Sequence, residues 1–141
     1  MIQQTLSIIK PDGVIKNIIG KIYSRFESEN LKIIAAKMKN ISIQEAHNFY
    51  VSHKENFFFS DLIKFICSGP SMIQVLEGED AITKNREIMG STNPMGAKKG
   101  SIRFDFGTSI EKNIIHGSDS MDSALYEIGC FFSTREIFGK R

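Results

Sequence analysis

Short runs of β-branched residues alternate along this chain with segments whose apolar residues recur every three or four positions. The first pattern is typical of buried strands and the second of amphipathic helices. Strands are predicted at residues 5–10, 31–41, 72–76 and 113–116, and helices at 18–29, from 42 onward, and at 57–67, 80–89 and 120–129. Strands separated by helices, with helix pairs packed on one face, indicate a small sandwich of the β-α-β-β-α-β kind.

Turn and capping residues mark the expected boundaries. Residues 11–13, Pro-Asp-Gly, form a strong turn signal that ends the first strand. Ser42 with Glu45 three residues later fits a capping box, in which each side chain bonds an amide of the other residue, so a helix is predicted to begin there. Asp80 is likewise expected to cap the short helix that follows it.

A long loop is predicted in the second half of the chain. Residues 90–100 read G-S-T-N-P-M-G-A-K-K-G, with three glycines and one proline in eleven positions. A loop of this length in a compact domain is usually functional. The segment that follows, residues 101–106, alternates polar and apolar side chains and reads as a strand on periodicity alone.

Composition excludes several classes of protein. With 41% hydrophobic and 24% charged residues, the 141 residues have the make-up of a globular chain, and one domain spanning residues 1–141 is expected. A formal net charge of +2 is too even to indicate a nucleic-acid backbone as the partner. No stretch approaches the ~20 apolar residues that span a bilayer.

The cellular setting is inferred from the N-terminus and the cysteines. The first dozen residues have no apolar signal core, so a cytoplasmic location without membrane association is expected. Cys67 and Cys130 stand alone, without Cys-x-x-Cys or Cys/His spacing. This favours reduced thiols over a disulfide scaffold or a zinc site.

One of the three histidines, His47, His53 and His116, is set in a context that favours catalysis. His116 follows two isoleucines at the end of a predicted buried strand and precedes Gly117, which leaves space for an approaching group. A neutral imidazole, with an unperturbed pKa of ~6.5, keeps a free lone pair on one nitrogen and can act as a nucleophile. The other nitrogen needs an orienting partner, and Glu127 on the next predicted helix can supply a carboxylate.

The segment N-I-I-H-G-S-D-S at residues 113–120 resembles the active-site signature of the nucleoside diphosphate kinase family. Further motifs of that family follow the same order: S-I-I-K-P-D-G at 7–13, S-G-P at 68–70, L-E-G at 76–78 and G-S-T-N-P at 90–94. The resemblance covers nearly the whole chain. It implies an α+β fold, a ferredoxin-like α/β sandwich whose four-stranded antiparallel sheet (β-α-β-β-α-β) carries helices on its faces and a long nucleotide-site loop. It also implies a short helical turn, not a strand, at residues 101–106.

The reaction implied by the resemblance is ping-pong phosphoryl transfer that maintains NTP and dNTP pools. His116 takes the γ-phosphate of a nucleoside triphosphate, chiefly ATP, as a pros-phosphohistidine and hands it to a nucleoside diphosphate. Ser118 is expected to steady Glu127, and the Tyr50 hydroxyl to donate to the transferred group.

Phosphoryl transfer demands cations and hydrogen-bond donors, because charge spreads over the oxygens of the transferring group. By resemblance, Arg86, Thr92 and Arg103 contact the nucleotide phosphates. Lys10 reaches the ribose 3′-hydroxyl and the transferring group, and Asn113 bonds the sugar together with Lys10.

The base site implied by the resemblance is apolar. Phe58 is expected to stack on the base, Ile110 to cover its other side and Leu62 to line the pocket. Of the cluster at residues 57–59, only Phe58 is expected to be exposed, and its two neighbours to lie in the core. Stacking is worth ~1–3 kcal/mol per base and does not read base edges, so broad base tolerance is predicted.

No dedicated metal cage is visible, because the chain has no D-x-D or H-x-x-x-H pattern. Mg²⁺ prefers waters and substrate phosphates to an all-protein site, so it is expected to arrive with the nucleotide. The glycine-rich P-loop pattern is also absent, so side chains must bind the phosphates. His53 matches a position that contacts phosphate in only some members of the family.

The end of the sequence bears on assembly. The chain stops at Arg141, soon after Glu127, without the C-terminal extension that in longer relatives braces a neighbouring subunit. A compact, bacterial-type homo-oligomer is expected, with tetramer and hexamer both open. The expected partners are ATP and other nucleoside di- and triphosphates, with no obligate nucleic acid.

Two alternatives belong to other classes. Residues 99–106, K-G-S-I-R-F-D-F, share the opening Lys-Gly and closing Phe of the RNA-recognition signature. However, Ser101 and Arg103 stand where base-stacking aromatics belong, so the stacking platform is missing. A regulatory protein that keeps the fold without activity is disfavoured by the intact His116, Glu127 and Lys10.

Overall fold

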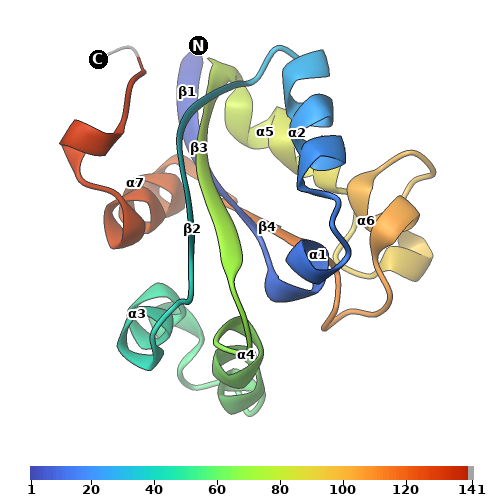
Figure 1. Ribbon diagram of the computed structural model, residues 1–141, viewed down its shortest axis with the longest axis vertical. Helices are drawn as coiled ribbons and strands as arrows, with labels where there is room; N and C mark the ends of the chain where they lie inside the picture. Colours follow the sequence, from blue (N-terminus) through green and yellow to red (C-terminus); the bar gives the residue numbers. More distant parts are fainter. Residues whose placement is uncertain (140–141) are drawn as a thin grey trace.

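A four-stranded antiparallel sheet organises the computed structural model, which describes residues 1–139 (Figure 1). The strand order is β2-β3-β1-β4, so β3 pairs antiparallel with both β1 and β2. The strands are β1 (Ile2–Ile9), β2 (Lys32–Lys39), β3 (Ser71–Glu79) and β4 (Ile115–Gly117). The four predicted strands are confirmed, although β3 is longer at both ends than its apolar run indicated.

The crossover helices α2 (Ile19–Ser28) and α5 (Ala81–Met89) pack together on one face of the sheet. Ile22 and Phe26 are fully buried there and contact the side chains that the strands direct to this face, Ile9 of β1 among them. Successive strand residues face opposite sides of a sheet, so a single strand serves both faces.

The opposite face is covered by α3 (Ile43–Phe49), α4 (Phe59–Ile66) and α7 (Met121–Phe131). In Figure 1, α7 lies on the side of the sheet away from α2, while α3 and α4 lie at one end. Leu6 and Ile8 of β1 point to this face and are fully buried. Truncating such a side chain to alanine typically costs about 2–5 kcal/mol of stability.

Side-chain capping marks the start of some helices and not of others. Ser42 accepts from the Glu45 amide at 3.1 Å while the Glu45 carboxylate accepts from the Ser42 amide at 3.0 Å, so the predicted capping box is confirmed. The prediction for Asp80 is wrong. Asp80 adopts a left-handed conformation with φ of 48° and makes no side-chain capping bond; its amide bonds the carbonyl of Met1 instead.

The loop that begins at residue 90 runs through a single turn at Pro94–Gly96 into α6 (Ile102–Phe106). The helical turn implied by the resemblance is therefore confirmed, and the strand indicated by alternation does not form. Ser101 explains the outcome, because its hydroxyl accepts from the Phe104 amide at 3.3 Å and caps the helix.

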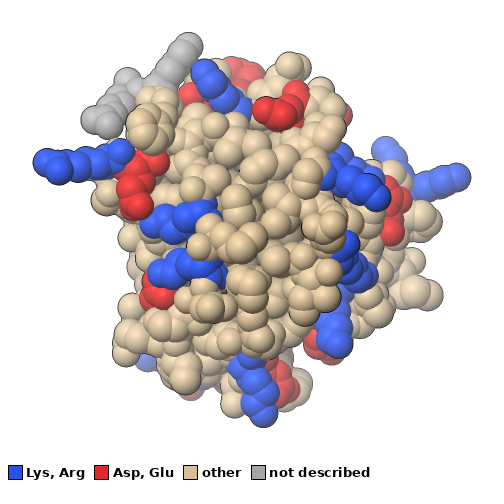
Figure 2. Space-filling view, in the orientation of Figure 1, with Lys and Arg blue, Asp and Glu red and all other residues tan. Residues whose placement is uncertain are grey.

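The remaining short elements flank the sheet. They are α1 (Pro11–Ile15) and single 3-10 turns at Val51–His53 and Thr134–Glu136. On the face seen in Figure 2, Lys and Arg side chains are interspersed with Asp and Glu. Among residues 1–139, no helix is long and apolar enough to cross a membrane.

Candidate active site

His116 is placed by the pairing of β4 with β1. It lies opposite Ile8, and directly opposed residues of an antiparallel pair share one face. The imidazole therefore projects toward α3 and α7. The Phe49 ring of α3 meets it edge-on, with ring centroids 4.9 Å apart.

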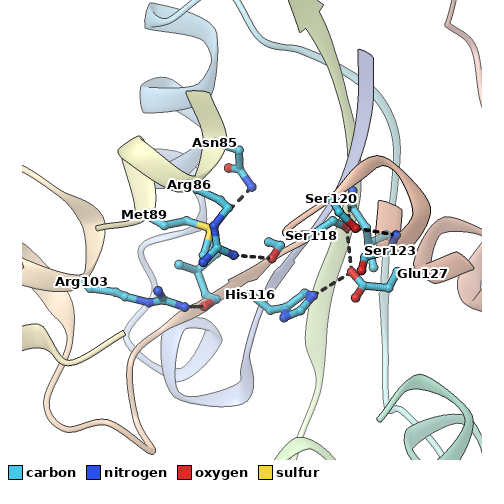
Figure 3. A network of polar contacts seen from close by, with 12 residues as sticks. Asn85, Arg86, Met89, Arg103, His116, Ser118, Ser120, Ser123 and Glu127 are labelled. Carbon is cyan, nitrogen blue, oxygen red and sulfur yellow. Dashed lines mark hydrogen bonds and ion pairs between the residues drawn. The ribbon is translucent and has the colours of Figure 1, made fainter. Parts of the chain in front are cut away.

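Glu127 of α7 holds the far side of the imidazole ring. Its Oε1 lies 2.9 Å from His116 Nε2, and the Ser118 hydroxyl donates to the same oxygen at 2.7 Å (Figure 3). An ionised carboxylate only accepts hydrogen bonds, so the ring proton sits on Nε2 and the Nδ1 lone pair is free. The predicted pairing of His116 with Glu127 and of Ser118 with Glu127 is present as geometry.

Ser118 is itself fixed to the sheet. It is fully buried, its hydroxyl accepts from the Leu6 amide at 3.3 Å, and its own amide donates to the Leu6 carbonyl at 3.1 Å. The chain of contacts from β1 through Ser118 and Glu127 to His116 therefore leaves the imidazole little freedom to rotate.

Gly117 lines the cavity and also makes room for helix α5. A Cβ at this position would lie 2.4 Å from both Asn85 Nδ2 and Met89 Sδ of α5. The space beside the histidine that the sequence suggested for an approaching group is taken by this helix. Gly117 lets β4 approach α5 closely, and its carbonyl accepts from Arg86 at 3.4 Å.

Lys10 and Asn113 lie side by side near the histidine. Lys10 Nζ donates to the Asn113 side-chain oxygen, and Asn113 Nδ2 donates to the Thr92 carbonyl at 2.9 Å. Burial lowers the pKa of Lys10 to about 8; Asp12 opposes this shift and Arg103 adds to it. An ammonium that is poorly solvated in this way gains most from an incoming anion.

Arg103 is buried and largely committed to the backbone. Its guanidinium donates to the carbonyls of Ile115 at 2.6 Å, Gly90 at 3.0 Å and Asn113 at 3.3 Å. Burial, with Arg86 nearby, lowers its pKa to about 10. The sequence indicated a phosphate ligand only, whereas the structure shows that Arg103 also ties the loop to β4.

Tyr50 directly follows α3, and its ring meets Phe49 edge-on at 4.9 Å. Burial, with smaller contributions from Glu127 and Cys67, raises the pKa of Tyr50 to about 12. The phenol is therefore protonated at neutral pH and can only be a donor or acceptor of hydrogen bonds, not a base.

These side chains surround a cavity of about 640 Å³. Eleven of the twelve residues singled out from the sequence line it, and Ser118 alone stands behind Glu127. The lining residues among them are Lys10, Tyr50, Phe58, Leu62, Arg86, Thr92, Arg103, Ile110, Asn113, His116 and Glu127. His53 also lines the cavity and lies 3.2 Å from the Asn56 side chain.

Apolar side chains are exposed at the rim of the cavity. Phe58 is partly exposed, as expected, and Ile110 lines the same cavity. Phe57 does not lie in the core, contrary to expectation: it is 98% exposed and meets Phe58 edge-on at 5.4 Å. The helix begins at Phe59, two residues later than predicted, so Phe57 precedes the buried helical stripe that Phe59 joins.

Sequence reasoning missed residues that support the site from outside the cavity lining. Phe49 packs against the imidazole, and Asp12, seen only as part of a turn signal, accepts from the Ile114 amide at 3.0 Å. Ile114 has a φ of 76°, an unfavourable conformation for a β-branched residue that costs of order 1–3 kcal/mol. No local signal identifies these contacts, because the partners are far apart in the chain.

Carboxylates do not gather into a metal cage in the part of the chain that the structure describes. Residues 1–139 contain no group of three or more His, Cys, Asp and Glu side chains placed to hold an ion. The acidic residues that line the cavity are Asp61, Glu111, Asp119 and Glu127. Such a donor set fits an ion that is carried mainly by phosphate oxygens and water.

Comparison with known proteins agrees with this geometry. The sequence matches the family described as nucleoside diphosphate kinase over residues 3–137. A nucleoside diphosphate kinase of Francisella tularensis subsp. novicida is 64% identical over 137 residues, which cover 97% of this chain and 98% of that protein. The chain belongs to the nucleoside diphosphate kinase family, and its activity is phosphoryl transfer between nucleotides.

Solved structures of the family share the fold. The nucleoside diphosphate kinase of Aquifex aeolicus superimposes with a TM-score of 0.95 at 47% identity, covering 97% of this chain and 99% of that one. The enzyme of Halobacterium salinarum, solved in complex with CDP, also gives a TM-score of 0.95, at 38% identity, covering 100% and 94%. The ferredoxin-like α+β architecture is thereby confirmed.

Proposed function

We propose that His116 is the covalent carrier of a ping-pong phosphoryl transfer. Nδ1 attacks the γ-phosphorus of a nucleoside triphosphate, the bond from that phosphorus to the bridging oxygen breaks, and the nucleoside diphosphate leaves. A second nucleoside diphosphate then takes the phosphoryl group from Nδ1. The observation that carries this proposal is the 2.9 Å contact between Nε2 and Glu127, because it leaves Nδ1 as the free nitrogen.

Glu127 also favours the intermediate. Once Nδ1 is phosphorylated, the ring loses its neutral lone pair and gains positive character, which the carboxylate stabilises. Ser118 keeps Glu127 in place, and the protonated Tyr50 donates to the transferred group. These three residues therefore act on His116 and on the phosphoryl group that it carries.

Cationic and polar side chains in the cavity wall bind the phosphates in this proposal. Arg86, Thr92 and Arg103 contact the phosphate oxygens, and Lys10 with Asn113 holds the sugar and the transferring group. Lys10 lies in the wall of the cavity as a poorly solvated ammonium, which suits it to the charge that spreads over phosphoryl oxygens.

Phe58, Leu62 and Ile110 hold the base by apolar contact. All three line the cavity, and Phe58 and Ile110 are exposed at its mouth. A relative solved with CDP shows that this fold accepts a pyrimidine nucleotide in at least one member. We infer broad base tolerance, with ATP as the chief donor.

Mg²⁺ accompanies the nucleotide in this proposal. The cavity offers scattered carboxylates and no cage, which fits an ion held by phosphates and water. When bound, the ion neutralises negative charge on the β- and γ-phosphates.

The setting of the enzyme completes the proposal. We infer one domain spanning residues 1–141, assembled into a homo-oligomer in the cytoplasm, with no obligate nucleic-acid partner. Light scattering tests the assembly, since a tetramer and a hexamer of a 15.9 kDa chain differ widely in mass.

Incubation with γ-labelled ATP and Mg²⁺, followed by acid or alkali, tests the carrier. The label is expected on the protein, stable to alkali and labile to acid, and released by any nucleoside diphosphate. Label that requires both nucleotides to be present, or that survives acid, would contradict a phosphohistidine intermediate.

A further inference from the structure

The segment that leads into His116 contains a strained turn. The Ile115 amide donates to the Asn113 carbonyl at 2.9 Å, and Ile114 between them has a φ of 76°. This combination defines the rarer, strained form of the γ-turn. The strained residue lies two positions before the proposed nucleophile, and its side chain is fully buried.

Strained backbone persists only where its surroundings hold it. Both polar groups of Ile114 are engaged by the segment after β1: its amide donates to Asp12 Oδ2 at 3.0 Å, and its carbonyl accepts from the Lys10 amide at 2.8 Å. A Cβ on Gly13 would lie 3.0 Å from Ile114 Cγ2 and 3.3 Å from its carbonyl oxygen. Glycine at that position therefore lets the two segments approach closely.

The turn determines how two functional groups sit relative to each other. Asn113, which contacts Lys10, is its first residue, and β4 with His116 starts at its last. If Ile114 relaxed to a negative φ, the chain direction between Asn113 and His116 would change. The nucleophile would then move relative to the groups that hold the nucleotide.

Among residues 1–139, the side chain that bonds Ile114 itself is that of Asp12, whereas Arg103 donates to the carbonyls on either side, those of Asn113 and Ile115. Asp12 does not line the cavity, so it is out of contact with a bound nucleotide. Its other oxygen, Oδ1, is buried without a hydrogen-bond partner among the described residues. Burial of an unpaired oxygen destabilises the fold, so a carboxylate that served only solubility would not be placed there.

We propose that Asp12 is a positioning residue for phosphoryl transfer, whose carboxylate locks the γ-turn at Ile114 and thereby aligns His116 with the groups that hold the nucleotide. The proposal rests on the proposed function of His116. In the sequence, Asp12 is recognisable only as part of the Pro-Asp-Gly turn, and its contact with the distant Ile114 amide is visible only in the structure.

Three variants test it. Asp12→Ala removes the acceptor, and Asp12→Asn keeps an acceptor oxygen without the charge. Gln3→Ala is the matched control, because the Gln3 side chain likewise accepts from a backbone amide, that of Ile82 at 3.2 Å, at the other end of β1. Each is assayed at about pH 6.5, well below the pKa of about 8 for Lys10, because loss of the Asp12 charge lowers this pKa further and the ammonium must stay charged.

The first readout is the single-turnover rate of protein labelling from γ-labelled ATP across nucleotide concentrations. Asp12→Ala is expected to lower the rate at saturating nucleotide by about 10- to 100-fold, since misplacement of ~1 Å can cost that much. The apparent nucleotide affinity should change far less. Asp12→Asn should recover most of the rate, and Gln3→Ala should match the wild type.

The second readout is the one-bond Cα–Hα coupling of Ile114 by NMR, which distinguishes positive from negative φ without reference to activity. It should show positive φ in wild type, Gln3→Ala and Asp12→Asn, and loss of it in Asp12→Ala. Positive φ retained in Asp12→Ala, or labelling as fast as in Gln3→Ala, would overturn the proposal.

The remaining outcomes are also decisive. If Asp12→Ala does not fold, Asp12→Asn decides alone: a large loss of labelling rate with positive φ intact refutes the acceptor role. If wild type takes up no label, the proposed function fails, and the coupling in Asp12→Ala still determines whether Asp12 holds the turn.

Discussion

The floor and the rim of the cavity are built in opposite ways. On the floor, Arg103 and Asn113 are 6% and 4% exposed, and each makes hydrogen bonds that fix its position. On the rim, Ile110 and Phe57 are 54% and 98% exposed. These two side chains are apolar, so no hydrogen bond fixes them in place.

This difference teaches how one site combines demanding chemistry with tolerant binding. In-line phosphoryl transfer depends on fixed positions and preorganised charge, which buried hydrogen bonds supply. Base binding by stacking needs only a π-face and apolar contact, which an open rim supplies. Substitutions on the floor should therefore affect rate, and substitutions on the rim should affect affinity modestly and for all bases alike.

The largest effect is expected for His116→Ala, which tests whether the floor carries the covalent step. Turnover should fall on the order of 10⁶-fold, as when other covalent nucleophiles are removed, because the imidazole that Glu127 orients is lost. Nucleotide affinity, measured by calorimetry, and the thermal midpoint should stay near wild type. Turnover like that of the wild type would require a different nucleophile.

Glu127→Gln should produce the next largest loss. An amide can donate to the ring and favour the wrong tautomer, so the rate of labelling should fall about 100-fold or more. Ser118→Ala should cost less, about tenfold, since one hydrogen bond to a charged group is lost. The matched control is Glu136→Gln, which removes a carboxylate that is bonded to Lys37 at 2.9 Å, away from the cavity; it should leave labelling unchanged.

The lowered pKa of Lys10 predicts a pH dependence of activity. Because burial lowers the pKa of Lys10 to about 8, the ammonium that we propose to bind the transferring phosphoryl group is lost as pH rises through that value. The value of kcat/KM reports ionisations of the nucleotide-free enzyme, so it should fall above about pH 8. An exposed lysine titrates at a much higher pH. Tyr50, with a pKa near 12, stays protonated across this window and does not compete as the cause.

A charge-preserving variant checks the assignment of that pH dependence. Arginine keeps its charge across this range, so Lys10→Arg should abolish the fall near pH 8, whatever its overall activity. Lys32→Arg on the edge strand β2 is the control and should keep the wild-type profile. An unchanged profile in Lys10→Arg would assign the titration to another group.

The sequence was informative wherever the deciding interaction is local. The capping box at Ser42 and Glu45 joins residues three apart, and the strand at residues 5–10 needs only its own apolar pattern. The order of motifs, with their known family context, then identified the residues that line the cavity. All of these signals lie within a few residues of the feature that they predict.

The errors share the opposite property. Asp80 fails as a cap because its backbone is left-handed, and Gly117 is set by α5, about 30 residues earlier in the chain. The bond from Asp12 to the Ile114 amide joins residues 102 apart. Contacts of this kind depend on the assembled sheet, so no periodicity or turn signal near either residue encodes them.

The smallest effects are expected on the rim, where Phe58 and Phe57 form a matched pair. Phe58→Ala should weaken nucleoside diphosphate binding by about 1–3 kcal/mol, roughly 5- to 150-fold in Kd, with similar losses for purines and pyrimidines. Phe57→Ala should weaken it less than about threefold, because a ring that is 98% exposed has little enclosed contact to lose. Calorimetric titration with ADP and CDP measures both. A larger loss from Phe57→Ala than from Phe58→Ala would move the stacking contact to the outer ring, and a strong base preference in either variant would show that the rim reads base identity.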